Sequence, residues 1–235
     1  MNAREGIGTP ESAPHGKLAH WRAGYSNGTA TVLIVQRQMA HYRIAFFEAL
    51  RTALALHGVR LRVANGVPAN KDLGKRDVGT LSWAEPLHPR YFWNSKLCWM
   101  PFSSSLRGVD LVVVTPENKL LYNLRQQFFD RQVRFAFWGH GGNLQGDSQS
   151  WPERYKRWCA RHADWWFAYT AKSERLVYEA GFPAQRTTVL NNSVDTRSLL
   201  QMRASISEEE GARIDRKSTR LNSSHSTLSR MPSSA

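Results

Sequence analysis

The stretch VDLVVVTPENKLLYNLRQQFFDRQVRFAF, residues 109–137, decides the fold class of this chain. Residues 109–114 form a run of valine and leucine broken only by Asp110, which is typical of a strand buried on both faces. Residues 118–129 are expected to form a helix, and residues 133–137 a second short strand. A strand, a helix and a strand joined by short loops predict two parallel strands with a helical crossover.

The same alternation extends to both sides of this stretch. Further strands are predicted at residues 31–35, 61–64, 97–100, 165–168 and 187–190, and further helices at residues 42–56, 152–163 and 171–180. Residues 65–96 are rich in proline and glycine and are predicted to form a long excursion. We therefore expect an α/β fold, with a Rossmann-like parallel sheet covered by helices on both faces.

The chain is expected to divide into four parts. Residues 1–29 are polar and rich in turn-forming residues, and they are predicted to be a disordered leader. Residues 30–200 hold the alternating pattern and are expected to be one domain, while residues 201–214 begin an interdomain segment. Residues 215–235 are interpreted as non-native sequence.

That last interpretation rests on a match to translated DNA. The peptide DRKSTRLNSSH, residues 215–225, is what a common short-read sequencing adapter encodes, and SRMPSSA, residues 229–235, matches the adapter bases that follow the barcode. Segments of this origin are set aside in reasoning about the fold. They contribute +3 to the net charge of +13, which leaves +10 on residues 1–214. We therefore expect the chain to be a truncated piece of a larger protein, cut near Ile214.

Composition narrows the class of protein. No run of eighteen apolar residues predicts a transmembrane helix, and the first thirty residues lack the apolar core of a signal peptide. Two cysteines, Cys98 and Cys159, do not suggest a disulfide framework, so a cytoplasmic setting is expected. The basic charge suits nucleic acid, acidic lipid or a phosphorylated substrate. Since the Lys-Ser-Thr-Arg segment lies in the non-native tail, no nucleic-acid partner is expected.

In open parallel sheets, ligands bind in the loops that follow the strands. That rule selects four loops, at residues 36–43, 115–119, 138–143 and 169–173. The first contains no glycine, which argues against a dinucleotide-binding loop, and it lacks the Lys-Ser/Thr pair of a nucleoside-triphosphate loop. No cysteine/histidine spacing suits zinc and no Gly-x-Ser-x-Gly elbow is present, so neither a metal nor another cofactor is expected.

Two of these loops carry the strongest candidates. Tyr42 and Arg43 stand at a predicted helix start, where an arginine can bind an anion, although a solvated surface position is an equally good interpretation of Arg43. His140 lies within the loop formed by Gly139, Gly141 and Gly142, where it can hydrogen-bond a sugar hydroxyl or a phosphate. A histidine that only caps the loop is the alternative.

The other two loops are less specific. Glu117, beside Asn118, can pair with an acceptor hydroxyl or favour the start of its helix through the helix dipole. Thr170 stands at an N-cap position, where its hydroxyl is expected to accept from backbone N–H groups. The helix around Trp158 is rich in arginine and tryptophan, which suits either core packing with solvated arginines or a membrane surface.

Several segments together resemble a known family. They are VLIVQRQMAHYRIAFFEAL (32–50), LVVVTPENKLLYNL (111–124), RFAFWGHGG (134–142), ADWWFAYT (163–170) and VLNNSVDT (189–196). In order and spacing they resemble the N-terminal domain of a retaining GT-B glycosyltransferase of the family 4 (group 1) type. Ser193 stands where the family usually has glycine in an Asn-Gly-Val-Asp segment, and the glycine-rich first loop of many members is missing.

The resemblance implies an acceptor-side domain of an enzyme that transfers sugar from a nucleotide sugar to a sugar or lipid-linked acceptor, as in polysaccharide biosynthesis. It implies that His140 lines the cleft as the catalytic histidine. It also implies that the nucleotide sugar is held mainly by a second Rossmann-like domain, so the fragment alone is expected to be inactive. Two alternatives stay open: a nucleotide-sugar epimerase, and a non-catalytic module that binds polyanions or the inner face of the membrane.

Overall fold

The structure is a computed structural model that describes residues 29–68, 77–129, 133–141, 154, 158–159, 161–191, 193, 195–207, 209–213 and 215–216. It divides into two compact units, residues 1–193 and residues 194–235. The first unit contains the whole sheet, and the second contains the helix α7 (Arg197–Ser205). No helix among the described residues is both long and apolar enough to span a membrane.

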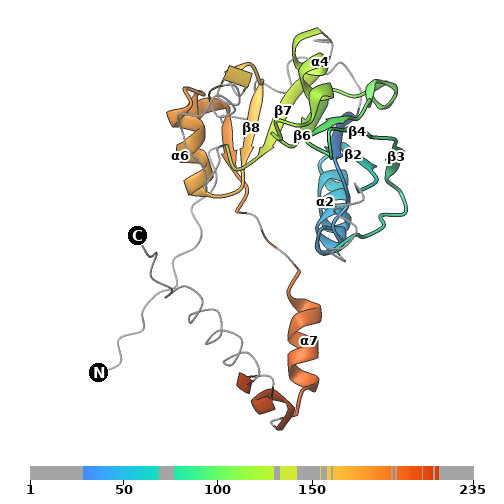
Figure 1. Ribbon diagram of the computed structural model, residues 1–235, viewed down its shortest axis with the longest axis vertical. Helices are drawn as coiled ribbons and strands as arrows, with labels where there is room; N and C mark the ends of the chain where they lie inside the picture. The colour runs from blue at the N-terminus through green and yellow to red at the C-terminus, as the bar shows by residue number, and fades with distance from the viewer. Residues whose placement is uncertain are drawn as a thin grey trace, which may run out of the picture. The chain divides into compact units, whose positions relative to one another are not determined.

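The first unit is built on a parallel sheet of seven strands in the order β3-β2-β1-β6-β7-β8-β9 (Figure 1). The strands are β1 (Ala30–Gln36), β2 (Val59–Gly66), β3 (Glu85–Leu87), β6 (Leu111–Val114), β7 (Arg134–Gly139), β8 (Trp165–Ala168) and β9 (Thr187–Val189). Every neighbouring pair among them runs parallel. The predicted Rossmann-like α/β fold is therefore confirmed.

Both faces of the sheet are covered, because alternate side chains of each strand enter two separate cores. On β1, Leu33 packs into one core and Ile34 into the other. The helices α4 (Leu121–Phe129) and α6 (Ala171–Glu179) contribute Tyr122 and Val177 to the first core. The helix α2 (Ile44–Leu56) contributes Phe47 to the second, so helices lie on both faces as predicted.

The predicted excursion at residues 65–96 contains more structure than its composition indicates. Its described part includes β3, an edge strand of the sheet, and β4 (Arg90–Phe92). The predicted strand at residues 97–100 is present as β5 (Leu97–Trp99), but it pairs antiparallel with β4 outside the main sheet. Strands of three residues carry too little hydrophobic periodicity to be recognised from sequence.

Several element boundaries differ from the prediction. The predicted helix 118–129 begins at Leu121, because residues before it form a turn in which Leu120 N donates to Glu117 O at 3.0 Å. The predicted helix 42–56 begins with the 3-10 helix η2 (His41–Arg43) and continues as α2. Most of the predicted helix 152–163 lies outside the described residues.

Two aspartates bind the first backbone groups of neighbouring strands. Asp110 precedes β6, and its Oδ2 accepts from Thr31 N on β1 at 2.7 Å, while its own N–H donates to Thr31 O at 2.9 Å. Asp164 precedes β8 and repeats the arrangement with Phe135 on β7, at 2.8 Å in each direction. Each pair satisfies backbone groups that the end of a parallel ladder leaves open.

Replacing Asp110 by alanine is expected to lower the free energy of unfolding by about 1–2 kcal/mol, because the N–H of the buried Thr31 loses a charged acceptor. Urea denaturation followed by far-ultraviolet circular dichroism measures the change. Glu179→Ala is the matched control, since Glu179 is exposed on α6 and its removal is expected to leave the midpoint unchanged. An unchanged midpoint for Asp110→Ala would show that the bond contributes nothing.

Ahead of α7, the Asp195 carboxylate accepts from the backbone N–H of Arg197 at 3.0 Å and from its guanidinium at 3.0 Å. These hydrogen bonds lower the pKa of Asp195 and raise that of Arg197. Both side chains are surface groups, so the pair organises the turn into α7 and adds little stability.

Candidate functional site

The four loops selected from the sequence meet around one cavity of about 340 Å³. It lies where β1, β6, β7 and β8 end, at the carboxyl edge of the sheet, which is where ligands bind in folds of this kind. Its wall is formed by residues 36–38, 40 and 42–43, Asp77, residues 115–117, residues 138–141 and Tyr169.

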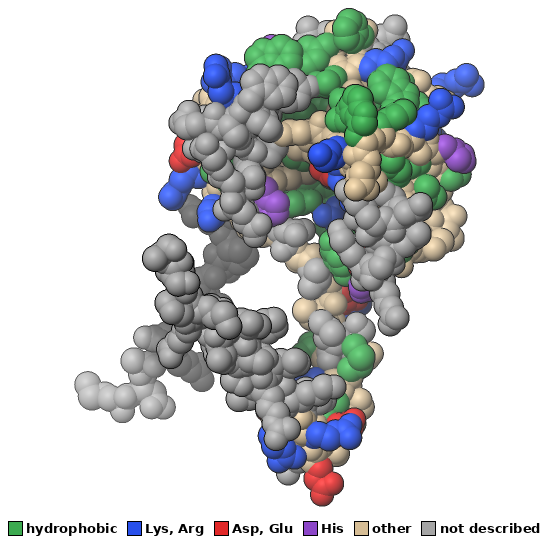
Figure 2. All heavy atoms as spheres, viewed as in Figure 1, with side chains coloured by type: hydrophobic (Ala, Val, Ile, Leu, Met, Phe, Trp, Pro, Cys, Tyr) green, Lys and Arg blue, Asp and Glu red, His purple; other side chains and the backbone are tan. Residues whose placement is uncertain are grey.

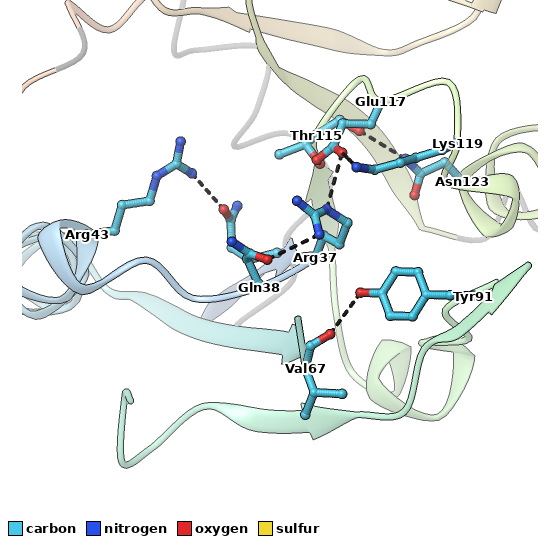
Figure 3. A network of polar contacts seen from close by, with 10 residues as sticks. Arg37, Gln38, Arg43, Val67, Tyr91, Thr115, Glu117, Lys119 and Asn123 are labelled. Carbon is cyan, nitrogen blue, oxygen red and sulfur yellow. Dashed lines mark hydrogen bonds and ion pairs between the residues drawn. The ribbon is translucent and has the colours of Figure 1, made fainter. Parts of the chain in front are cut away.

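Arg43 is held inside the wall. Its Nη1 donates to Gln36 Oε1 at 2.6 Å and its Nη2 to Tyr169 Oη at 2.8 Å (Figure 3 draws the arginine at this wall). The guanidinium also lies 5.2 Å from the ring centre of Trp138. Burial acts to lower the pKa of Arg43, but the contacts with Tyr169 and Tyr42 act against it, and the pKa lies above its ordinary value. The alternative of a solvated Arg43 is therefore wrong.

Tyr42 lies beside Arg43 at the mouth of the cavity. Its side chain is 44% exposed, and its ring is 5.9 Å from the Arg43 guanidinium. Both residues belong to η2, which is joined to the end of β1 by the loop of residues 37–40. The pair therefore presents an accessible aromatic ring next to a cation that is already hydrogen-bonded.

Glu117 is bound by two cations on the opposite wall. Its Oε2 lies 3.3 Å from Arg37 Nε and 2.9 Å from Lys119 Nζ. Figure 3 draws both contacts as dashed lines. Thr115 Oγ1 donates to the other carboxylate oxygen at 3.3 Å. Because α4 begins only at Leu121, the carboxylate lies ahead of the first turn of that helix, and its role in favouring the helix start stays a prediction.

His140 lies at the end of β7 and faces α6. Its Nδ1 is 3.3 Å from Ser173 Oγ, and its ring packs edge-on against Tyr169 with 4.6 Å between the centres. Ser173 is almost fully buried, and its Oγ lies 3.1 Å from Thr170 Oγ1. The imidazole is therefore oriented by a buried hydroxyl on one side and an aromatic ring on the other.

The glycines on either side of His140 are required for packing. A Cβ on Gly139 would stand 2.5 Å from Pro116 Cγ, so the glycine lets β7 approach the loop after β6. Gly141 has φ of +77°, and a Cβ there would stand 2.5 Å from Val177 Cγ2. Their backbone lines the cavity, and their small size brings His140 against α6. Gly142 lies outside the described residues.

Two predicted site residues lie away from the cavity. Asn118 is exposed and borders a separate small pocket of about 30 Å³ beside α4. Thr170 is exposed, and its Oγ1 accepts from Ser173 N at 3.2 Å, which confirms the predicted N-cap of α6. Binding roles for both remain predictions.

Several wall residues were not named as candidates from the sequence, among them Arg37, Asp77, Trp138 and Tyr169. Arg37 and Tyr169 directly follow strands and Trp138 is the second-last residue of β7, so their positions were available as a signal. Asp77 reaches the site differently. It lies next to an isolated antiparallel bridge between Val78 and Ala40, where His41 N donates to Asp77 O at 2.8 Å. No sequence pattern marks such a bridge.

The described residues of the predicted tryptophan-rich helix, residues 152–163, include an exposed aromatic side chain. Trp158 is 49% exposed and stacks on Phe128 of α4, with 4.7 Å between ring centres. Phe129 is 85% exposed at the end of α4. Trp158 and Phe129 are therefore accessible aromatic side chains of the kind that the membrane-surface interpretation requires. Trp151, Tyr155 and Arg157, which belong to the same predicted helix as Trp158, lie outside the described residues.

The chemistry available at the cavity is polar and free of thiols. Within the described ranges, no group of three or more His, Cys, Asp or Glu side chains is placed to hold a metal ion. Cys98 and Cys159 are not joined in a disulfide, and both are buried away from the cavity wall. What remains is one histidine, two arginines, two carboxylates and aromatic rings, which suit hydrogen bonding to a polyhydroxylated ligand.

Comparison with known proteins finds similar solved structures at low identity. No family model matches the chain, and no curated protein matches it. HepE from Anabaena, in complex with UDP, is 14% identical over 70% of this chain and 44% of that chain, with a TM-score of 0.42. The lipopolysaccharide outer core galactosyltransferase WaaB, in its apo form, is 13% identical over 72% of this chain and 47% of that chain, with a TM-score of 0.44.

A third similar structure is the UDP-GlcNAc 2-epimerase from Methanocaldococcus jannaschii. It is 14% identical over 68% of this chain and 45% of that chain, with a TM-score of 0.42. The chain therefore spans less than half the length of each of these three proteins.

Proposed function

We propose that this chain is the acceptor-side domain of a glycosyltransferase that moves a sugar from a nucleotide sugar to a hydroxyl of an acceptor. The observation that carries the proposal is the cavity at the carboxyl edge of the sheet, with His140 and Tyr42 on its wall. The resemblance of residues 32–50, 111–124, 134–142, 163–170 and 189–196 to the N-terminal domain of a family 4 type enzyme supports it.

In this proposal His140 binds the acceptor or the transferring sugar. An imidazole held by Ser173 through Nδ1 is oriented before any ligand arrives, which reduces the cost of ordering it on binding. A histidine in such a place accepts or donates a proton near neutral pH. Glu117 and the backbone of Gly139 and Gly141 would form the floor against which the acceptor rests.

The leaving diphosphate would be stabilised elsewhere. Arg37 is ion-paired with Glu117, and Arg43 already donates to Gln36 and Tyr169, so both arginines are engaged by groups of this domain. Diphosphate departure requires donors aimed at the developing charge. We therefore assign those donors to a second Rossmann-like domain of the parent enzyme, which would face this cavity.

A turnover assay tests the proposal. The purified chain of 235 residues is expected to consume none of UDP-glucose, UDP-galactose, UDP-N-acetylglucosamine or GDP-mannose, because the diphosphate site would lie on the second domain. The intact parent enzyme, assayed alongside, is expected to release the nucleotide from one of them when an acceptor is present. Mass spectrometry of the nucleotide and sugar products provides the measurement.

Two outcomes would contradict the proposal. Turnover by the chain alone would mean that the donor site is here. An epimerised nucleotide sugar formed by the parent enzyme without any acceptor would favour a nucleotide-sugar epimerase instead.

A further inference from the structure

Two buried polar atoms on the cavity wall lack a hydrogen-bond partner among the described residues. One is Nε1 of Trp138, a side chain that is only 4% exposed. The other is Oδ1 of Asp77. Both side chains line the same cavity. One atom is an obligatory donor and the other an acceptor, so a ligand that satisfies both must both accept and donate hydrogen bonds.

Leaving such groups unsatisfied is unfavourable. A buried donor or acceptor without a partner costs about 1–3 kcal/mol, and this cost is recovered when a ligand supplies the missing bond. Both groups are also well fixed. Trp138 packs against Phe46 and Phe47, with ring centres 5.5 Å and 6.1 Å away. The backbone of Asp77 is fixed by the hydrogen bond that His41 N donates to Asp77 O. On the other side of the Ala40–Val78 bridge, Gly79 N donates to Met39 O at 3.0 Å.

The charges on the wall indicate a neutral ligand. The chain is basic, with 32 Lys and Arg against 19 Asp and Glu, and Figure 2 shows Lys and Arg side chains on one face, but the charges on the cavity wall are balanced. Arg37 and Arg43 are matched there by Asp77 and Glu117. An anion would have to displace Glu117 from Arg37 or approach the Asp77 carboxylate, and both steps cost Coulomb energy.

The shape and lining agree with a sugar ring. The cavity of about 340 Å³ is within the range of small-molecule sites, and the Tyr42, Trp138 and Tyr169 side chains give it aromatic walls. Uncharged hydroxyl groups both donate and accept. A pyranose ring therefore offers a hydroxyl to the indole N–H, a second hydroxyl to the carboxylate, and apolar C–H groups to the aromatic rings.

We propose that this cavity binds an uncharged sugar ring, with Trp138 and Asp77 as the residues that select it. The Trp138 indole N–H donates to one ring hydroxyl, and the Asp77 carboxylate accepts from another. The inference rests on the proposed function, since the bound ring is the terminal residue of the acceptor. It goes further in naming the specificity residues and in rejecting an anionic acceptor group at this position.

The test follows the Trp138 indole N–H directly by NMR. The ¹⁵N-labelled full chain is titrated with glucose, galactose, mannose and N-acetylglucosamine, and in parallel with glucuronate, inorganic phosphate and UDP. The Trp138 cross-peak is assigned as the one that Trp138→Phe removes. We expect it to shift saturably with at least one neutral sugar, because a new hydrogen bond forms at that proton, and to stay in place with phosphate.

Substitution of Asp77 tests the hydrogen bond that its carboxylate would accept from the sugar. Asp77→Ala is expected to weaken binding of the same sugar about tenfold, which corresponds to the loss of one hydrogen bond to a charged group. The affinity of Asp77→Asn is expected to lie between those of Asp77→Ala and the unaltered chain. Glu179→Gln removes an exposed carboxylate from α6, and Trp93→Phe changes a tryptophan that is 75% exposed. Both are matched controls that are expected to bind as the unaltered chain does.

The possible outcomes distinguish a failure of this inference from a failure of the proposed function. Saturation by phosphate or glucuronate, with no response to neutral sugars, would overturn the neutral-sugar assignment and leave an acceptor site in place. A Trp138 shift on addition of UDP would place the nucleotide here and overturn the proposed function itself. No response to any probe, or unchanged affinity in Asp77→Ala, would overturn the inference.

Discussion

Replacing Gly141 by alanine is expected to lower the free energy of unfolding of the sheet-bearing unit by about 2–4 kcal/mol. Two effects add at this position. The backbone has φ of +77°, where an L-residue is strained, and the new Cβ would stand 2.5 Å from Val177 Cγ2 and 3.0 Å from Ser173 O. Val177 is buried in the first core, so it has little room to move.

Gly108→Ala separates these two effects. Gly108 has φ of +67° and nothing within 4 Å of the added Cβ, so it carries the backbone strain without the clash. About 1 kcal/mol is expected there. Urea denaturation of both variants measures the difference, which is the packing contribution of α6 against the His140 loop. Equal losses in the two variants would show that Val177 and Ser173 adjust freely.

In the full-length glycosyltransferase proposed above, replacing His140 by alanine is expected to lower the rate of sugar transfer by about tenfold or more, the scale of a lost positioned acid–base or hydrogen-bonding group. The cavity places the imidazole beside the region where the acceptor would bind, and Ser173 fixes its orientation. The rate constant at saturating nucleotide sugar is the quantity to measure, with the Michaelis constant for the acceptor determined alongside.

Two further variants make that result interpretable. His88→Ala removes an exposed histidine that is not on the cavity wall, and it is expected to leave the rate unchanged. Ser173→Ala keeps the imidazole but removes its orienting hydroxyl, so a smaller loss with a changed pH profile is expected. A normal rate for His140→Ala would assign the histidine a structural role.

The sheet was predictable because the sequences of its central strands are distinctive. The residues of β1 and β6 are buried on both faces, and only a nearly continuous run of valine, leucine and isoleucine tolerates that environment. Strands β3 and β4 have three residues each and mixed composition, so nothing local distinguished them from a loop. Their pairing depends on contacts with β2 and β5, which no short window contains.

The location of the candidate site was predictable from the sequence, but the contacts between its side chains were not. The rule that ligands bind after parallel strands located all four loops, since it depends on topology alone. The partners of Arg43 could not be found in this way, because Tyr169 lies 126 residues away and meets it only in the folded sheet. Asp77 was missed for the same reason, as a backbone bridge brings it to the wall.

The bond between Arg43 and Tyr169 also bears on how the cavity is completed. It joins the 3-10 helix η2, which follows β1, to the residue after β8, and β6 and β7 lie between these two strands in the sheet. Because Arg43 and Tyr169 both line the cavity, its wall is complete only when β1, β6, β7 and β8 are all in place.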